Sequence, residues 1–142
     1  MSVSTVTTSP EETEAAAARL GARLGRGALL LLVGELGAGK TTFVRGLARG
    51  MRACGHVASP TFQLVRVYPG PVPLAHVDLY RLGREAELAD LDLDGLLDDG
   101  AVAVEWGDRL GTPDGALRVL IEPIDERRRR LTLEGGTNGW SW

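Results

Sequence analysis

Cysteine and long apolar runs are almost missing from this sequence, and both scarcities narrow the class of protein it encodes. Its one cysteine, Cys54, cannot form a disulfide within the chain, so a reducing compartment, the cytoplasm, is expected. No apolar run approaches the roughly 18 residues of a membrane-spanning helix, so we expect no membrane partner. Residues 1–9 are polar and uncharged, which argues against a secretory signal.

Lysine is nearly absent as well, because positive charge is carried almost entirely by arginine and Lys40 is the only lysine. A single lysine in such a chain marks a position that needs a compact, flexible ammonium group instead of a planar guanidinium. The net charge of −3 argues against non-specific binding of nucleic acid over the whole surface, and no DNA partner is expected. The four arginines at 127–130 are best interpreted as a solvated turn and strand start.

The pattern of apolar and turn-forming residues predicts one α/β domain spanning residues 1–142, with a mixed or parallel sheet flanked by helices. Helices are predicted at 10–24, 40–51, 84–91 and 93–97, and strands at 28–33, 62–68, 72–77, 101–104, 117–122 and 130–134. Ser9 caps the first helix, and Glu12 would complete a capping box. The glycine-rich residues 136–142 are expected to form a flexible tail, although Trp140 and Trp142 could dock on the body.

A glycine-rich segment follows the apolar strand predicted at 28–33 and matches the pattern G-x-x-x-x-G-K-[ST] in full: Gly34-Glu35-Leu36-Gly37-Ala38-Gly39-Lys40-Thr41. Glycines allow backbone N–H groups to surround a phosphate, and the helix that follows adds its positive N-terminal end. Lys40 would reach the β- and γ-phosphates, and Thr41 would bind magnesium. The fold class is therefore expected to be P-loop NTPase-like, with a nucleoside triphosphate as ligand.

The base of that nucleotide is indicated by a missing motif. A guanine-specific site of the Ras type needs an Asn-Lys-x-Asp element, but the only asparagine is Asn138 and the only lysine lies in the phosphate loop. ATP with magnesium is therefore the expected cofactor.

Acidic residues that would complete the site follow two predicted strands. Asp78 and Glu105 each come after a largely apolar run, and ligands of open α/β sheets bind at the carboxyl ends of strands. For both residues, the alternative interpretation is an ordinary solvated acid at the end of a strand. Trp106 would stack near the nucleotide or simply pack, Thr61 could place a hydroxyl near the γ-phosphate, and His76 fits a packed histidine better than a catalytic base.

Together the motifs resemble the TsaE (YjeE) family of small bacterial ATPases. The likeness covers about residues 12–130 and rests on four segments in order: 34–43 (GELGAGKTTF), 59–62 (SPTF), 76–82 (HVDLYRL) and 105–106 (EW). A generic P-loop protein would share only the first segment. Glu35 stands where the family often has aspartate, which keeps the charge.

The resemblance implies a partner-dependent ATPase that acts with TsaD and TsaB in making threonylcarbamoyladenosine on tRNA, so that tRNA is an indirect partner. It implies that residues 37–42, including Thr42, wrap the phosphates and that Thr41 and Glu105 hold magnesium. It further implies that Asp78 is needed for hydrolysis and that Thr61 lies in a switch-like segment. Thr13 and Arg128 are the residues we assign to the family's adenine contacts.

Two other functions remain open from the residues alone. A small-molecule or nucleotide kinase could recruit Arg81, Arg84 and Arg109, although no insertion long enough for a lid is evident. A nucleotide-sensing module with negligible turnover would carry the same phosphate loop. Turnover in the presence of partners distinguishes these functions.

Overall fold

The computed structural model describes residues 2–35, 39–54, 65–79, 92–105, 115–135 and 140–142. The helices in these ranges are α1 (Pro10–Gly21), α2 (Lys40–Gly50) and α4 (Leu93–Asp99). The strands are β1 (Ser2–Thr7), β2 (Leu29–Val33), β3 (Val65–Tyr68), β4 (Leu74–Asp78), β5 (Ala101–Glu105), β6 (Leu117–Pro123) and β7 (Arg129–Gly135). The helix predicted at 84–91 lies outside the described residues.

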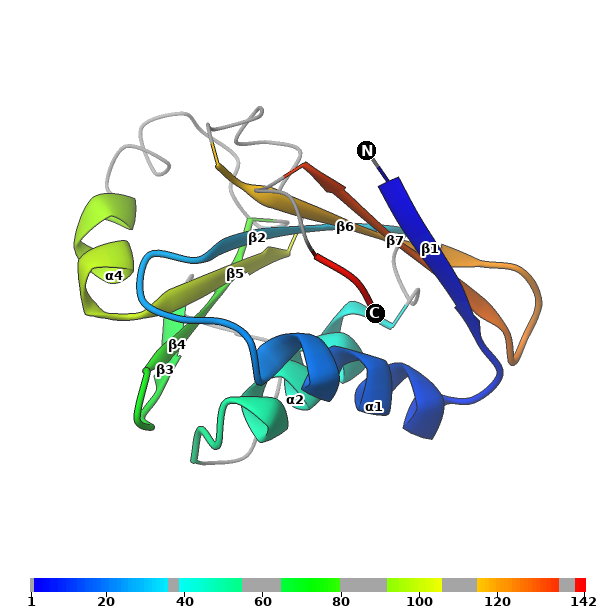
Figure 1. Ribbon diagram of the computed structural model, residues 1–142, viewed down its shortest axis with the longest axis horizontal. Coiled ribbons are helices and arrows are strands. Elements are labelled where there is room, and N and C mark those ends of the chain that lie inside the picture. Colours follow the sequence, from blue (N-terminus) through cyan, green and yellow to red (C-terminus); the bar gives the residue numbers. More distant parts are fainter. Residues whose placement is uncertain (1, 36–38, 55–64, 80–91, 106–114, 136–139) are drawn as a thin grey trace.

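All seven strands form one sheet in the order β1-β7-β6-β2-β5-β4-β3 (Figure 1). The four central strands, β6, β2, β5 and β4, are mutually parallel, whereas β7, β1 and β3 join by antiparallel pairing. The predicted mixed sheet is therefore confirmed. Within the described ranges, no helix is long and apolar enough to cross a membrane.

The central strands have the apolar sequences expected of strands that are covered on both faces. Leu30 and Leu32 of β2 point into the core cluster beneath α1 and α2, while Leu29 and Leu31 point into a second cluster that α4 covers. The helices therefore lie on opposite faces of the sheet (Figure 1). This layering exposes the carboxyl end of β2, where the phosphate loop begins, at one edge of the molecule.

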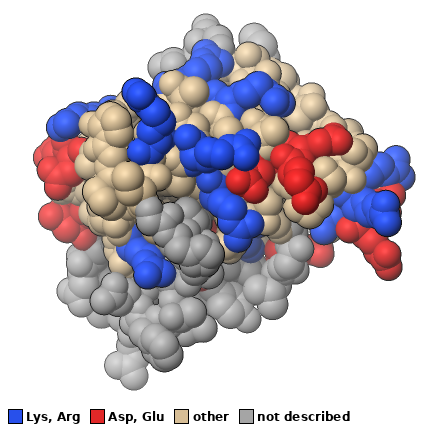
Figure 2. Space-filling view, turned by 90° about the horizontal axis from the view of Figure 1, so that it is seen from below, with Lys and Arg blue, Asp and Glu red and all other residues tan. Residues whose placement is uncertain are grey.

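Helices α1 and α2 pack closely because glycines stand at their crossing. A Cβ atom added at Gly46 would lie 2.3 Å from the carbonyl oxygen of Glu14, and one at Gly50 would lie 2.0 Å from that of Ala18. The outward face of this pair carries many arginines with acidic side chains beside them (Figure 2), including the ion pair between Arg49 and Glu14 at 3.3 Å. The small residues thus fix one helix against the other beneath a solvated surface.

Strand β1 was not predicted, because residues 2–7 were interpreted only as a polar terminus. They alternate serine or threonine with valine, and β1 pairs in full with β7 at the edge of the sheet. Alternation of small polar and apolar residues suits a half-buried edge strand, and its partner lies at the far end of the sequence.

The tryptophans of the tail dock on the body, as the sequence allowed. Trp140 and Trp142 pack against the core cluster beneath α1 and α2. The ring of Trp142 meets that of Phe43 edge-on, with centroids 5.9 Å apart, and the guanidinium of Arg23 lies 4.8 Å from the ring centroid of Trp140. Trp140 is therefore held beside Arg23, just after α1, and Trp142 beside Phe43 of α2, while residues 136–139 lie outside the described ranges.

Candidate nucleotide site

The start of α2 has the backbone geometry that the phosphate-loop motif requires. Gly39 caps the helix with φ of 108°, a left-handed conformation that residues with a Cβ rarely adopt. Thr41 and Thr42 occupy the first turn of α2, where backbone N–H groups have no partner within the helix. Leu36, Gly37 and Ala38 lie outside the described residues. The described part of the motif therefore presents donors at the carboxyl end of β2.

Lys40 is buried, with 5% of its surface exposed, although it is a charged residue at the start of a helix. Its ammonium group donates to the carbonyl oxygen of Gly34 at 2.7 Å. The side chain therefore folds back over the beginning of the loop instead of extending into solvent. This location places the only ammonium side chain of the protein beside the backbone that would surround a phosphate.

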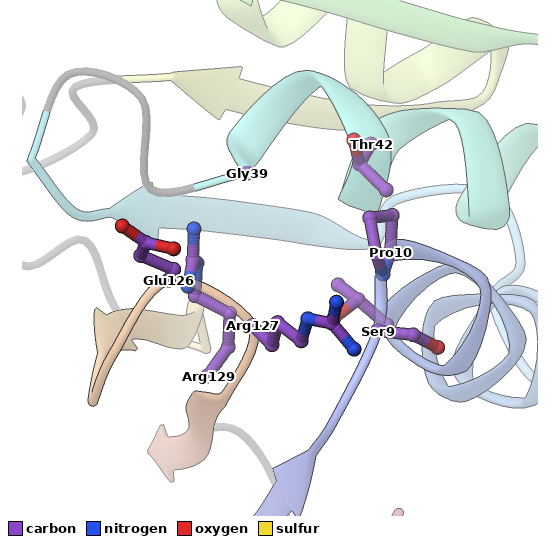
Figure 3. A pocket seen from close by; sticks show the side chains of 8 residues that line it. Ser9, Pro10, Gly39, Thr42, Glu126, Arg127 and Arg129 are labelled. Atoms are coloured by element: carbon purple, nitrogen blue, oxygen red, sulfur yellow. The ribbon is translucent and has the colours of Figure 1, made fainter.

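A cavity of about 240 Å³ lies directly beside this helix start. Its walls come from three places that are distant in sequence: the start of α1, the start of α2, and the turn between β6 and β7 (Figure 3). The lining residues are Ser9, Pro10, Thr13, Gly39, Thr42, Glu126, Arg127 and Arg129. Side chains from the β6–β7 turn extend toward the start of α1 and toward Gly39 (Figure 3). The cavity therefore adjoins the phosphate loop and is walled by hydroxyl and guanidinium groups together with the carboxylate of Glu126.

The wall contributed by α1 is held by hydroxyl contacts. The hydroxyls of Thr13 and Thr7 lie 2.6 Å apart and are buried, which ties α1 to the end of β1. Ser9 caps α1 by accepting from the N–H of Glu12 at 3.1 Å, as predicted. The carboxylate of Glu12 reaches one residue further back than a capping box requires and accepts from the N–H of Thr8 at 3.2 Å. This bonding by the Thr8 hydroxyl and N–H lowers the pKa of Glu12.

The wall contributed by the β6–β7 turn is organised by Asp125. Its carboxylate accepts from the N–H of Arg128 at 2.8 Å, from Nε of Arg128 at 2.6 Å and from the N–H of Arg127 at 3.0 Å. The backbone bond from Arg128, then its side-chain bond, lowers the pKa of Asp125 to about 2. Arg129 also donates to the carbonyl oxygen of Asp125 at 2.7 Å. The turn is therefore a fixed loop that holds arginine side chains beside the cavity.

Of the two residues assigned to adenine, Thr13 lines the cavity and Arg128 does not. Arg128 borders a neighbouring hollow of about 660 Å³, together with Thr8, Asp125, Glu126 and Arg127. Its neighbours Arg127 and Arg129 line the cavity instead. The sequence could not tell which of four consecutive arginines would point inward, because this depends on the Asp125 turn.

The two predicted acids lie side by side at the carboxyl ends of neighbouring parallel strands. Asp78 is the last residue of β4 and pairs directly with Glu105, the last residue of β5. Both are buried, with exposures of 8% and 4%. They belong to the ends of the strands instead of following them, which moves each predicted boundary by one residue. Directly paired residues point to the same face of a sheet, so the two carboxylates share one face.

His76 contacts one of these acids. Its Nε2 lies 2.6 Å from Oε2 of Glu105, and both side chains are almost fully buried. The sequence indicated only a packed histidine. Its spacing of two residues from Asp78 was the pattern that could have placed it on the same face as the acids.

The chemistry of these two acids fits a magnesium ion. Magnesium prefers oxygen ligands and is usually held by one or two carboxylates together with phosphate oxygens. Asp78 and Glu105 supply two neighbouring carboxylates at the sheet edge where β2 runs into the phosphate loop. Thr61 and Trp106, the other predicted site residues, lie outside the described part of the chain.

A mixed sheet whose second strand leads through a glycine-capped turn to a helix, with carboxylates at neighbouring strand ends, defines a P-loop NTPase-like α/β protein. Comparison with known proteins gives the family. The model of the TsaE family, described as threonylcarbamoyl adenosine biosynthesis protein TsaE, matches residues 7–131. The chain belongs to this family.

Individual relatives agree with that assignment. The tRNA threonylcarbamoyladenosine biosynthesis protein TsaE of Streptomyces coelicolor is 46% identical over 121 residues, which cover 82% of this chain and 74% of that protein. The protein of the same name from Bacillus subtilis is 39% identical, covering 89% and 82%. The crystal structure of YdiB from Bacillus subtilis superposes with a TM-score of 0.81 at 32% identity, covering 97% of this chain and 88% of the other.

Proposed function

We propose that this protein binds and hydrolyses ATP, with magnesium, as the ATPase component that acts with TsaD and TsaB in tRNA threonylcarbamoyladenosine biosynthesis. The observation that carries the proposal is the cavity beside Gly39 and Thr42, which joins the phosphate loop to walls from α1 and the β6–β7 turn. Family membership supports the place in tRNA modification.

The phosphates would lie along residues 34–42, with Lys40 against the β- and γ-phosphates. The nucleoside would occupy the cavity, where Thr13 supplies a hydroxyl and Arg127 and Arg129 supply planar guanidinium groups that can stack on a base. Arg128 would approach from the neighbouring hollow. The site thus separates a phosphate end at the sheet edge from a base end between α1 and the turn.

Thr41 and Glu105 are the residues that would hold magnesium, whose chemistry when bound is to neutralise negative charge on the phosphates. Asp78 lies beside Glu105 on the neighbouring strand, where it would orient the attacking water. Thr61 and Trp106 are proposed to act near the γ-phosphate and the nucleotide, as their motifs suggest.

The location proposed for this activity is the cytoplasm. Cys54 is an exposed free thiol, which suits a reducing compartment. The tRNA would be met through the TsaD and TsaB complex.

One experiment tests this function against the two alternatives. ATP hydrolysis is measured with the purified protein alone and with TsaD and TsaB added, together with the yield of modified tRNA. We expect slow turnover alone, stimulation by the partners, and restored tRNA modification. Phosphate transfer to a small acceptor without a partner effect would show a kinase, and binding without turnover in any mixture would show a sensing module.

A matched pair of variants tests the phosphate loop itself. Lys40→Ala removes the ammonium group and should abolish nucleotide binding, whereas Arg45→Ala, an exposed residue on the same helix, should leave it unchanged. Glu105→Ala should reduce magnesium-dependent turnover more than nucleotide binding. Unchanged nucleotide affinity in Lys40→Ala would refute the assignment of the loop.

A further inference from the structure

The buried contact between His76 and Glu105 has no part in the function proposed above. The imidazole has 0% of its side chain exposed and the carboxylate 5%, and their atoms Nε2 and Oε2 are 2.6 Å apart. Burial of two polar side chains in contact is costly unless the hydrogen bond between them is well made. The location of this buried polar pair at the carboxyl edge of the sheet, beside Asp78, therefore points to a role besides packing.

The register of the sheet shows how the contact arises. His76 on β4 pairs with Ala103 on β5, and Asp78 pairs with Glu105 two residues further along. All four residues point to one face of the sheet. The alanine has a small side chain, so the imidazole can reach diagonally across it to the carboxylate of Glu105. Ala103 is itself fully buried, which keeps this arrangement dry.

The other ring nitrogen indicates which atom donates. Nδ1 of His76 is buried and has no hydrogen-bond partner among the described residues. A hydrogen on Nδ1 would leave a buried donor unpaired, whereas a hydrogen on Nε2 is donated to Glu105 and leaves only a lone pair unpaired. The second arrangement satisfies more groups. Among the described residues, the hydrogen bond of the His76 ring is then donated by Nε2 to the carboxylate of Glu105.

We propose that His76 is a positioning residue, which holds Oε2 of Glu105 by a hydrogen bond and so turns Oε1 toward a divalent cation. This rests on the proposed function, in which Glu105 is a magnesium ligand. Groups that orient metal-binding carboxylates are worth about 10- to 100-fold in metal affinity when they are removed. The effect should therefore appear in magnesium affinity and not in the affinity for nucleotide without metal.

The test uses a fluorescent, non-hydrolysable ATP analogue, so that no turnover is needed. Its affinity is measured in EDTA and then across a magnesium titration, for the full-length wild type and for a set of variants. His76→Gln keeps an amide donor at about the position of Nε2, whereas His76→Asn is too short to reach Glu105. Leu74→Val, on the same strand and the same buried face, controls for loss of core packing.

We expect all three variants to bind the analogue in EDTA as the wild type does. The magnesium concentration for half-maximal tightening should rise about 10- to 100-fold in His76→Asn, and should stay near the wild-type value in His76→Gln and Leu74→Val. His76→Phe, which keeps a ring of similar size, should behave as His76→Asn does and serves as a second variant if the asparagine change prevents folding.

The outcomes separate this inference from the function on which it rests. If Glu105→Gln loses the magnesium effect but His76→Asn and His76→Phe keep it, the positioning role is wrong and the proposed function stands. If the wild type shows no nucleotide binding or no magnesium effect, the proposed function fails and the role of His76 fails with it. Equal weakening in EDTA and in magnesium would show a structural residue only, which also overturns the proposal.

Discussion

The indole N–H of Trp142 donates to the backbone carbonyl of Val3 at 3.0 Å, so the last residue of the chain is bonded to its first strand. The same indole packs edge-on against Phe43, the residue after Thr42 in the first turns of α2. Trp142 is therefore packed against the helix that begins at the candidate nucleotide site.

The first prediction concerns this tail. Trp142→Ala should lower the free energy of unfolding by about 2 kcal/mol, because it removes a half-buried aromatic ring and one hydrogen bond. Trp142→Phe keeps the ring contact with Phe43 and loses the N–H, so its free energy of unfolding should fall by about 1 kcal/mol. Urea unfolding followed by circular dichroism measures both. Identical unfolding midpoints for the three proteins would show that the docked tail adds no stability.

The second prediction concerns the crossing of α1 and α2. Gly46→Ala should lower the free energy of unfolding by about 1–3 kcal/mol. The added Cβ would lie 2.3 Å from the carbonyl oxygen of Glu14 and 2.6 Å from the Cβ of Ala17. Gly25→Ala is the matched control, because an added Cβ there has nothing within 4 Å. Thermal unfolding should separate the two variants clearly. A Gly46→Ala protein as stable as Gly25→Ala would mean that the helices are not in tight contact.

The third prediction separates support of the cavity from contact with nucleotide. Thr7→Val and Thr13→Val each leave a buried hydroxyl without its partner, so each should lower the free energy of unfolding by about 1–3 kcal/mol. The double variant should lose less stability than the two single variants lose in sum, because no hydroxyl is then left buried without its partner. Only Thr13 lines the cavity, so only its variant should also weaken ATP binding. Equal losses of ATP affinity in the two single variants would remove Thr13 from the nucleotide contacts.

The fourth prediction concerns pH. The pKa of Asp125 is lowered from 3.8 to about 2 by the N–H and side chain of Arg128 and the N–H of Arg127. A lowered pKa in the folded state means that the stabilising contribution is fully present above pH 3.8 and is lost as the pH falls through about 2. A carboxyl titration by NMR should show a midpoint near 2 in the wild type.

Arg128→Ala provides the comparison for that titration. It removes the side-chain bond to Asp125 but keeps the backbone N–H, so the pKa should rise only part of the way toward 3.8. Arg130→Ala, the next exposed arginine outside the turn, should leave the midpoint in place. A wild-type midpoint at 3.8 would show that the turn is open in solution.

The sequence predicted most of the sheet and the start of α2 after Gly39, because these features are local. The run from Leu29 to Val33 is wholly apolar, and the loop motif specifies Gly39 and Lys40 by their chemistry. Asp78 and Glu105 were found because apolar strands ended at them. The boundaries were less accurate: α1 ends at Gly21 instead of near residue 24, and both acids lie within their strands.

What the sequence could not give depends on contacts between distant segments. Residues 2–7 alternate as an edge strand does, but the pairing of β1 with β7 joins segments more than 120 residues apart in the sequence. The inward direction of Arg127 and Arg129 follows from the Asp125 turn, and the contact of His76 with Glu105 follows from the register of two strands. Local patterns such as the alternation in residues 2–7 or the spacing of His76 and Asp78 do not name the partner, which only the three-dimensional pairing supplies.

The pairing of the first strand with the last has a consequence for synthesis on the ribosome. Strand β1 is synthesised before its partner β7 and before the indole that binds Val3. The cavity likewise needs Ser9 from the beginning of the chain and Arg127 from near its end. Because a ligand stabilises only a chain that has formed its site, a ligand of this cavity cannot assist folding before the β6–β7 turn has been synthesised. The proposed ATP binding would therefore begin only after the β6–β7 turn has left the ribosome.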